Sequence, residues 1–261
     1  MGCGGSKNSM VFSRKGLFPT KLLQKGGEAV TIMDPIYIFG GKKVLSYSTK
    51  ANKISEVPIT VELPRRTQCE YLTGLDKIAT LGGTNPDKSI SKSAYLLTPP
   101  QFNTPVKLPD FPIPIRYTTL AYFNNFLYAV GGQTTGTDPE DIIKDVYVIS
   151  LNKEGFGAKW EKFCDLDIRR RSANLVVSEN AIFVFAGYSG EGNRSTQIDR
   201  IDIASKKAEK LEFRLPLGVE GARVAWFSKS ILFIGGKRHE QKPDANVLVM
   251  NFNKKAIVSV R

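Results

Sequence analysis

The sequence is poor in the residues that most often build metal, disulfide or nucleophilic sites. It has three cysteines, Cys3, Cys69 and Cys164, and one histidine, His239, among 261 residues. No two cysteines have the CxxC spacing, and a zinc ion wants about four Cys, His or carboxylate ligands. These shortages argue against a zinc site and a disulfide framework. We therefore expect a protein of a reducing compartment, with no cofactor and no metal.

Long apolar runs are absent as well. The segment AIFVF at 181–185 is among the longest, whereas a membrane-spanning helix needs about 20 residues. Nothing in residues 1–30 supplies the apolar core of a secretory signal. Apolar residues still make up 41% of the chain and are evenly spread, which indicates a folded globular protein and not a disordered one. No segment has the 3.6-residue periodicity of a long helix.

Acidic residues are missing from the first 27 positions, which contain five of the basic residues behind the formal net charge of +12. This stretch begins MGCGGSK and matches the myristoylation pattern, with Gly2 as the acylated residue and Cys3 placed for palmitoylation. Stable anchoring takes a second signal besides one acyl chain, and basic residues are attracted to anionic lipid. We expect residues 1–26 to be a flexible lipidated leader that holds the protein at the cytosolic face of a membrane.

One design occurs five times in the remaining sequence. An apolar run ends in a pair of small residues in IYIFGG, KIATLGG, FLYAVGG, AIFVFAG and ILFIGG. The first small residue of each pair is Gly40, Gly82, Gly131, Ala186 or Gly235, with successive gaps of 42, 49, 55 and 49 residues. Glycine suits these positions because it permits positive φ and close packing. A period near 50 residues is typical of kelch propellers, and such a period predicts repeated structural units.

Each apolar run lies within a set of short strand signals. One precedes it, such as YTTLAYFN, and two follow it, such as DVYVISL and KWEKFCDL. Four antiparallel strands repeated five times predict an all-β fold, a β-propeller of about five blades over residues 27–261. The segment AIVSVR at 256–261 is expected to form the fourth strand of the last unit, and MVFSRKGLF in the leader is a candidate further edge strand.

These segments resemble the kelch-repeat family. The third unit carries the resemblance best, with Gly131, Gly132, Tyr147 and Trp160, whereas the fourth and fifth units lack the tyrosine. The resemblance implies four-stranded blades whose structural glycines are Gly40, Gly41, Gly82, Gly83, Gly131, Gly132, Gly187, Gly235 and Gly236. It also implies binding to cytoskeletal or signalling proteins, a function common among kelch proteins.

Catalysis finds little support in the sequence. The single histidine lies in the charged loop GGKRHEQKPDA, and no P-loop, GxGxxG or HExxH motif is present. The carboxylates Asp138, Glu140 and Asp141 in TGTDPED are typical of a loop and helix cap, and not of an acid/base pair. We therefore expect a protein that is not an enzyme.

Basic residues precede the first strand of four units. We expect them to gather on one face with the long loops, because a propeller places both at the same ends of its strands. Arginine forks suit carboxylates and phosphates, although one arginine per unit can serve a structural role. The candidates for contact with a partner are Arg65, Arg66, Arg116, Arg169, Arg170, Arg171, Arg223, Lys237 and Arg238.

The preferred hypothesis is a membrane-tethered kelch scaffold that binds an acidic protein partner through its loop face. Nucleic acid is disfavoured, because the basic residues are not interleaved with aromatic platforms. Two alternatives stay open. One is a propeller enzyme or small-molecule binder with a site at the central channel, and the other is a soluble protein-binding propeller without lipid.

Overall fold

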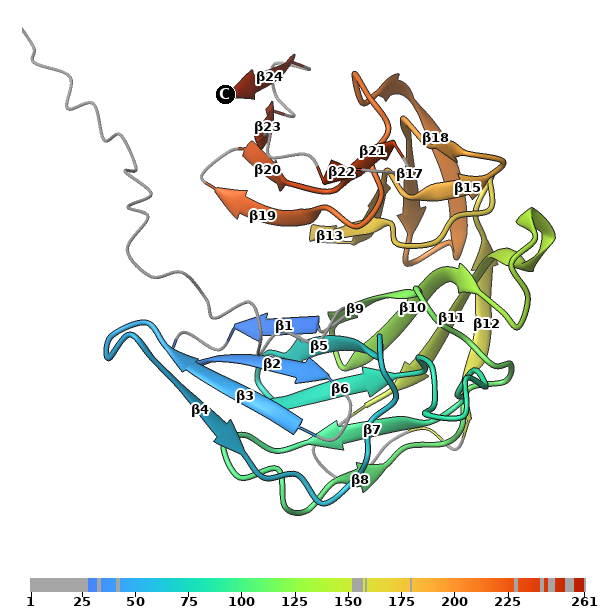
Figure 1. The fold of residues 1–261 in the computed structure, drawn as a ribbon. Coiled ribbons are helices and arrows are strands. Elements are labelled where there is room, and N and C mark those ends of the chain that lie inside the picture. Colours follow the sequence, from blue (N-terminus) through green and yellow to red (C-terminus); the bar gives the residue numbers. More distant parts are fainter. Residues whose placement is uncertain are drawn as a thin grey trace, which may run out of the picture.

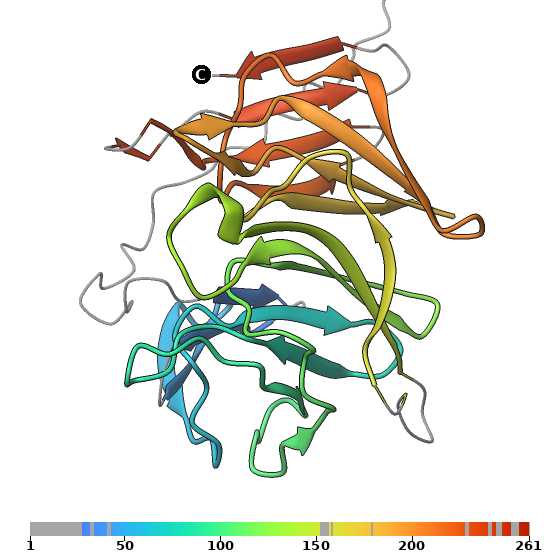
Figure 2. The ribbon, with the colours of Figure 1, turned by 90° about the vertical axis from the view of Figure 1, so that its right-hand side faces the viewer.

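The computed structural model describes residues 28–31, 34–40, 43–151, 157, 159–178, 180–227, 230–239, 242–243, 247–251 and 256–260. Within these ranges the chain forms five antiparallel sheets of four strands each, two small two-stranded sheets and no α-helix. No helix of the described part is long and apolar enough to cross a membrane. The five large sheets follow one another in chain order around a common centre, from blue to red in Figure 1. Figure 2 shows the same succession of sheets from the side.

The strands have the following bounds. The first sheet contains β1 (Glu28–Thr31), β2 (Ile36–Gly40), β3 (Lys43–Ser48) and β4 (Lys53–Val57). The second contains β5 (Gln68–Leu72), β6 (Lys77–Leu81), β7 (Ala94–Leu97) and β8 (Val106–Lys107). The third contains β9 (Thr119–Phe123), β10 (Phe126–Gln133), β11 (Ile142–Ser150) and β12 (Glu161–Asp165).

The fourth sheet contains β13 (Asn174–Ser178), β14 (Ala181–Phe185), β17 (Gln197–Asp202) and β18 (Lys207–Arg214). The fifth contains β19 (Arg223–Phe227), β20 (Ser230–Ile234), β23 (Val247–Asn251) and β24 (Ala256–Val260). The hairpins β15–β16 (Tyr188–Gly190, Asn193–Arg194) and β21–β22 (Lys237–His239, Lys242–Pro243) lie in the loops of the last two sheets.

The expectation of an all-β chain of repeated four-stranded antiparallel units is therefore confirmed. The segment at 256–260 pairs with β23 and completes the last sheet, as predicted. The two loop hairpins were not predicted, because their sequences are short, polar and without alternation. The leader, with Gly2 and Cys3, lies outside the described residues, and so does Gly41.

Apolar clusters fill the spaces between successive sheets. Phe39 of the first sheet packs with Ile78 of the second, and Leu81 of the second lies in one cluster with Leu127 of the third. The remaining two clusters join the third sheet to the fourth and the fourth to the fifth. Strands such as β6 are buried along nearly their whole length, because each inner sheet has a neighbour on both faces. The innermost strands contact one another in the sequence β1, β5, β9, β13 and β19.

The glycine pairs bind the segment that leads into the next sheet. The amide of Gly83 donates to the carbonyl oxygen of Ile115 at 2.8 Å, and the amide of Gly132 donates to that of Arg170 at 2.9 Å. A Cβ at Gly82 would lie 2.2 Å from the carbonyl oxygen of Ile115, and Gly82 has φ of +60°. The close approach and the positive φ together explain why glycine recurs with the period of the sheets.

Candidate functional site: an arginine–tyrosine cluster

The segments that link one sheet to the next carry arginines at equivalent positions. Arg65, Arg116 and Arg171 each form an isolated antiparallel bridge to the residue that follows a small-residue pair, namely Thr84, Gln133 and Tyr188. At the next link the same position is Glu220, which bridges to Lys237. This backbone pairing fixes the links against the ends of the second strands. The side chains at these positions therefore belong to one end of the sheets.

Tyr117 brings three arginines of these links together. The guanidinium carbons of Arg66, Arg116 and Arg171 lie 5.4, 5.3 and 5.2 Å from the centre of its ring. A guanidinium nitrogen of Arg66 also donates to the Tyr117 hydroxyl. Aromatic faces attract cations within about 6 Å, so the ring stabilises three like charges that would otherwise repel one another. Tyr117 has φ of +55°, a conformation rare for a bulky residue.

A second tyrosine extends this arrangement toward the fourth sheet. Arg171 lies 4.4 Å and Arg194 lies 5.5 Å from the centre of the Tyr188 ring. Glu220 pairs with both arginines, at 3.6 Å from Arg171 and 3.2 Å from Arg194. We call Arg66, Arg116, Tyr117, Arg171, Tyr188, Arg194 and Glu220 the arginine–tyrosine cluster.

The cluster carries excess positive charge. Its four guanidinium groups are accompanied by a single carboxylate, that of Glu220, so its net charge is three positive. Two further contacts orient it: Arg171 Nη1 donates to Gln133 Oε1 at 2.5 Å, and Arg116 Nη2 donates to the carbonyl oxygen of Gly136 at 3.0 Å. Arginines held in this way suit carboxylate or phosphate groups, because their fork geometry is already fixed before binding.

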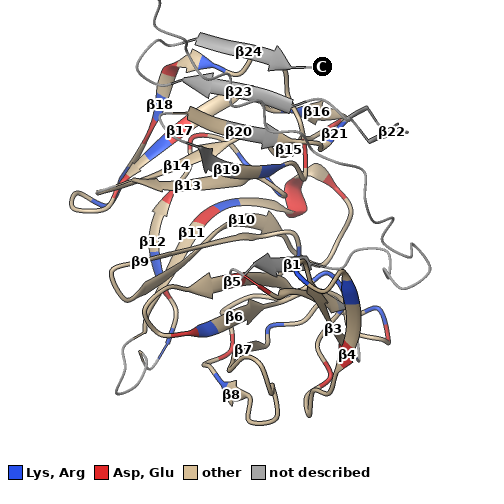
Figure 3. Cartoon of the chain, turned by 90° about the vertical axis from the view of Figure 1, so that its left-hand side faces the viewer, with Lys and Arg blue, Asp and Glu red and all other residues tan. Residues whose placement is uncertain are grey.

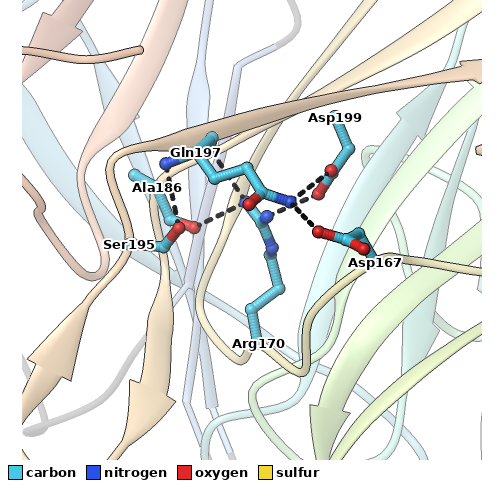
Figure 4. A network of polar contacts seen from close by, with 6 residues as sticks. All are labelled: Asp167, Arg170, Ala186, Ser195, Gln197 and Asp199. Carbon is cyan, nitrogen blue, oxygen red and sulfur yellow. Dashed lines mark hydrogen bonds and ion pairs between the residues drawn. The ribbon is translucent and has the colours of Figure 1, made fainter. Parts of the chain in front are cut away.

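Arg170 has a structural position. Its side chain is fully buried, and its Nη1 donates to the carbonyl oxygens of Ala186 and Gln197 at 3.1 Å each. Its Nη2 forms an ion pair with Asp199 Oδ2 at 2.5 Å, and Figure 4 shows how the two side chains point toward each other. Burial raises the pKa of Asp199, and the guanidinium opposes that shift. Because no part of this side chain reaches the surface, Arg170 is not available to a partner, contrary to its inclusion among the candidates.

The remaining candidates lie at separate places. Arg65 and Arg169 are exposed, and Arg223 is exposed at the start of β19. Lys237 is partly buried, and its backbone forms the bridge to Glu220. The side chains of Arg238 and His239 lie outside what the structure describes. The structure thus brings Arg66, Arg116 and Arg171 into one cluster and leaves Arg65 and Arg169 outside it.

Sequence reasoning missed four members of the cluster. They are Tyr117, Tyr188, Arg194 and Glu220. Aligning the residue after each small-residue pair with the residue three positions before each inner strand would have placed Tyr188 beside Arg171. Arg194 lies in a loop whose length differs from unit to unit, so the repeat gives no register for it.

The carboxylates of the TGTDPED segment have a structural role. Asp138 precedes a short 3-10 turn, η1 (Pro139–Asp141), and Oδ2 of Asp141, the last residue of the turn, accepts from the Asp138 amide at 3.0 Å. This agrees with the expected cap, and the acidic turn lies beside β10 and β11 in Figure 3. Among the described residues, no group of three His, Cys, Asp or Glu side chains lies close enough to hold a metal ion.

Comparison with known proteins supports the resemblance to kelch repeats. No family model matches the chain. Over 140 residues, 53% of the chain, it is 26% identical to Kelch-like protein 41b of Danio rerio. The matched part spans 23% of the length of that relative. The match and the repeated four-stranded sheets together support a relationship between this chain and the kelch-repeat proteins.

Proposed function

We propose that this chain is a non-enzymatic kelch scaffold that binds an acidic segment of a protein partner at the arginine–tyrosine cluster. The observation that carries the proposal is the gathering of four guanidinium groups around two tyrosine rings with only one carboxylate. Recognition often lies in loops displayed on a rigid scaffold, and these side chains come from the links and loops of successive sheets. The similarity to a Kelch-like protein supports a protein-binding role.

We further propose that the five sheets are the blades of a closed propeller. Support comes from the succession of innermost strands around one centre, from β1 to β19 (Figure 1). A closed ring would fix the links relative to one another, and hence the spacing of the arginines that they carry.

The binding proposal is tested with acidic peptides and their amide counterparts. Fluorescence anisotropy would compare a peptide rich in Glu with the same peptide carrying Gln, on the wild-type protein and on the Arg66→Gln/Arg116→Gln double variant. We expect preference for the acidic peptide, and a loss of about tenfold or more in the double variant. Added salt should weaken binding by the wild type more than binding by the variant.

Arg214 provides a matched control for that experiment. It is exposed on the outer strand β18, and Arg214→Gln removes one positive charge outside the cluster. Lys210→Gln on the same strand can be added to match the charge change of the double variant. Equal losses in the control and the cluster variant would show that net charge alone attracts the peptide, and the proposal would fail.

The membrane tether is a separate part of the proposal, supported by the sequence MGCGGSK. Acylation of Gly2 and Cys3 would place the scaffold at the cytosolic face of a membrane and raise its effective concentration for weak contacts. Intact mass and membrane fractionation of the wild type, Gly2→Ala and Cys3→Ser in eukaryotic cells test this. We expect one or two acyl masses and release by either substitution. An unmodified, soluble wild type would overturn the tether and leave the peptide-binding proposal untouched.

A further inference from the structure

A cavity of about 160 Å³ lies where the innermost strands of four sheets meet. Its wall includes Gln68 and Glu70 of β5, Thr119 of β9, Asn174 of β13 and Arg223 of β19. In Figure 1 these strands lie at the centre of the five sheets. The cavity is separate from the arginine–tyrosine cluster, and none of the cluster residues lines it.

Four of the lining residues occupy one register position. Gln68, Thr119, Asn174 and Arg223 each pair with the last residue before a small-residue pair, namely Leu81, Val130, Phe185 and Ile234. All four side chains are polar, and Glu28 has the corresponding backbone position on β1. The repeat thus builds a polar layer at the start of the innermost strands, where the core of a sheet protein is usually apolar.

The next layer contains one polar side chain. Two residues further along each strand, the positions are Val30, Glu70, Ala121, Val176 and Ala225. Glu70 is therefore an acid in a layer of alanine and valine. Within the described residues its carboxyl group has no hydrogen bond or ion pair, and burial raises its pKa to about 8. An ionised carboxylate in such surroundings gains most from a cationic partner.

Hydrogen-bonding capacity is also unused on the facing wall. Asn174 is only 3% exposed, yet its Nδ2 has no partner within the described residues. The hydroxyl of Thr119 donates to the carbonyl oxygen of Ala173 at 3.0 Å, which leaves its oxygen free to accept. Buried amides without a partner are rare in folded proteins, so an acceptor contributed by a ligand would satisfy Asn174.

We propose that the cavity binds a small zwitterionic amine, of the α-amino acid class. Its ammonium group would contact Glu70 on β5, and its carboxylate would lie toward Asn174 and Arg223 on β13 and β19. The strands that carry Glu70 and Arg223 are not neighbours, because β9 and β13 lie between β5 and β19 in the sequence of contacting strands. The volume limits the ligand to a few non-hydrogen atoms, since about 30 Å³ is the share of one water molecule in the liquid.

The proposal predicts a specific dependence on pH. At neutral pH Glu70 is protonated, because its pKa is about 8, so binding an ammonium ion would release a proton. Affinity for the zwitterion should therefore rise as the pH approaches 8. Arg223 is the other charged residue that lines the cavity, and Glu28 holds the backbone position on β1 that corresponds to Arg223 on β19. A simple carboxylate ligand would show the opposite dependence, since ionised Glu70 would repel it.

Three probes of similar size separate the possibilities: free L-alanine, ethylamine, which lacks the carboxylate, and propionate, which lacks the amine. Chemical-shift changes of the side-chain amides of Gln68 and Asn174 would report binding to the full chain. We expect alanine to bind most tightly, with a loss of about tenfold or more in Glu70→Gln. Arg223→Gln should weaken the binding of alanine and leave the binding of ethylamine unchanged.

A folding check and a control variant separate an effect at the cavity from a general effect on the protein. Glu70→Gln preserves size and removes a half-buried acid, so it should fold, and a dispersed amide spectrum would verify this. Glu161→Gln, on the exposed surface of β12, makes the same change away from the cavity and should bind like the wild type. Propionate binding as tightly as alanine, alanine binding unchanged in Glu70→Gln, or no binding by any probe would each overturn the proposal. None of these results depends on a protein partner.

Discussion

Arg170 and Asp199 form an ion pair in which both side chains are fully buried, with 2.5 Å between Nη2 and Oδ2. Arg170 lies in the link before β13, and Asp199 lies on β17 of the same sheet. The links into the third and fifth sheets have Ile115 and Val219 at the equivalent position, where their carbonyl oxygens accept from Gly83 and Gly187. The fourth sheet therefore uses a buried charge pair where its neighbours use an aliphatic side chain.

Asp199→Asn is expected to lower the free energy of unfolding by about 3–5 kcal/mol, because it leaves a buried guanidinium without its counter-charge. Denaturant unfolding followed by circular dichroism measures this. The exposed pair Lys43–Glu56, whose side chains are 57% and 56% exposed, supplies the control. Glu56→Gln should change the same quantity by less than about 1 kcal/mol. Similar losses in the two variants would contradict the buried-pair explanation.

Replacing both residues of the buried pair tests the same interaction without leaving a charge unpaired. Arg170→Ile with Asp199→Val should recover much of the stability lost in Asp199→Asn, because apolar groups can replace a buried ion pair at little cost. Ile115 and Val219 show that aliphatic side chains occupy this position in the neighbouring links. A double variant less stable than Asp199→Asn would instead show that the hydrogen bonds of Arg170 to Ala186 and Gln197 are the larger contribution.

The strands were predictable because apolar β-rich runs and small-residue pairs recur with one period. AIVSVR was assigned to the last sheet by the same period, and β24 confirms it. The burial of Arg170 was not predictable, since three consecutive arginines at 169–171 are identical in sequence and differ only in burial and in their contacts with other segments. Tyr117 was overlooked because its role depends on arginines from two other links, far apart in the chain.

Gly82→Ala is expected to be more destabilising than Gly74→Ala. Both glycines have positive φ, of +60° and +87°, so both substitutions strain the backbone. An added Cβ at Gly82 would also lie 2.2 Å from the carbonyl oxygen of Ile115, whereas nothing lies within 4 Å of one at Gly74. We expect an additional loss of about 1–3 kcal/mol at Gly82, measured by denaturant unfolding. Equal losses of stability would mean that the segment containing Ile115 shifts away from the added Cβ without lowering the free energy of unfolding.

Tyr117→Leu should destabilise the protein by about 1.5–3 kcal/mol, from the loss of three guanidinium contacts at about 0.5–1 kcal/mol each. Tyr117→Phe keeps the ring and removes only the hydroxyl that accepts from Arg66, so it should cost less. Thermal unfolding at low and high salt distinguishes the two variants. Salt should reduce the loss in Tyr117→Leu, because it screens repulsion between the arginines. Equal losses in the two variants would assign the effect to the hydroxyl alone.

Glu70 should make the stability of the protein fall as pH rises. Its pKa is about 8 in the folded chain, against 4.5 for an unperturbed glutamate. Below pH 4.5 the carboxyl group is neutral in both the folded and the unfolded state. Between 4.5 and 8 the unfolded chain ionises first, which favours unfolding by up to about 1.4 kcal/mol per pH unit. Above pH 8 both states are ionised and the loss is complete.

Glu70→Gln removes this titration and isolates its contribution. The difference in free energy of unfolding between the variant and the wild type should grow in favour of the variant across the interval from pH 4.5 to pH 8. Denaturant unfolding at several pH values measures it, and Glu161→Gln on β12 should run parallel to the wild type. A constant difference between Glu70→Gln and the wild type would show that Glu70 ionises as readily in the folded chain as in the unfolded one. The ionised form of the acid in the alanine and valine layer would then already be stabilised without a ligand, which would remove the reason for a cation to bind there.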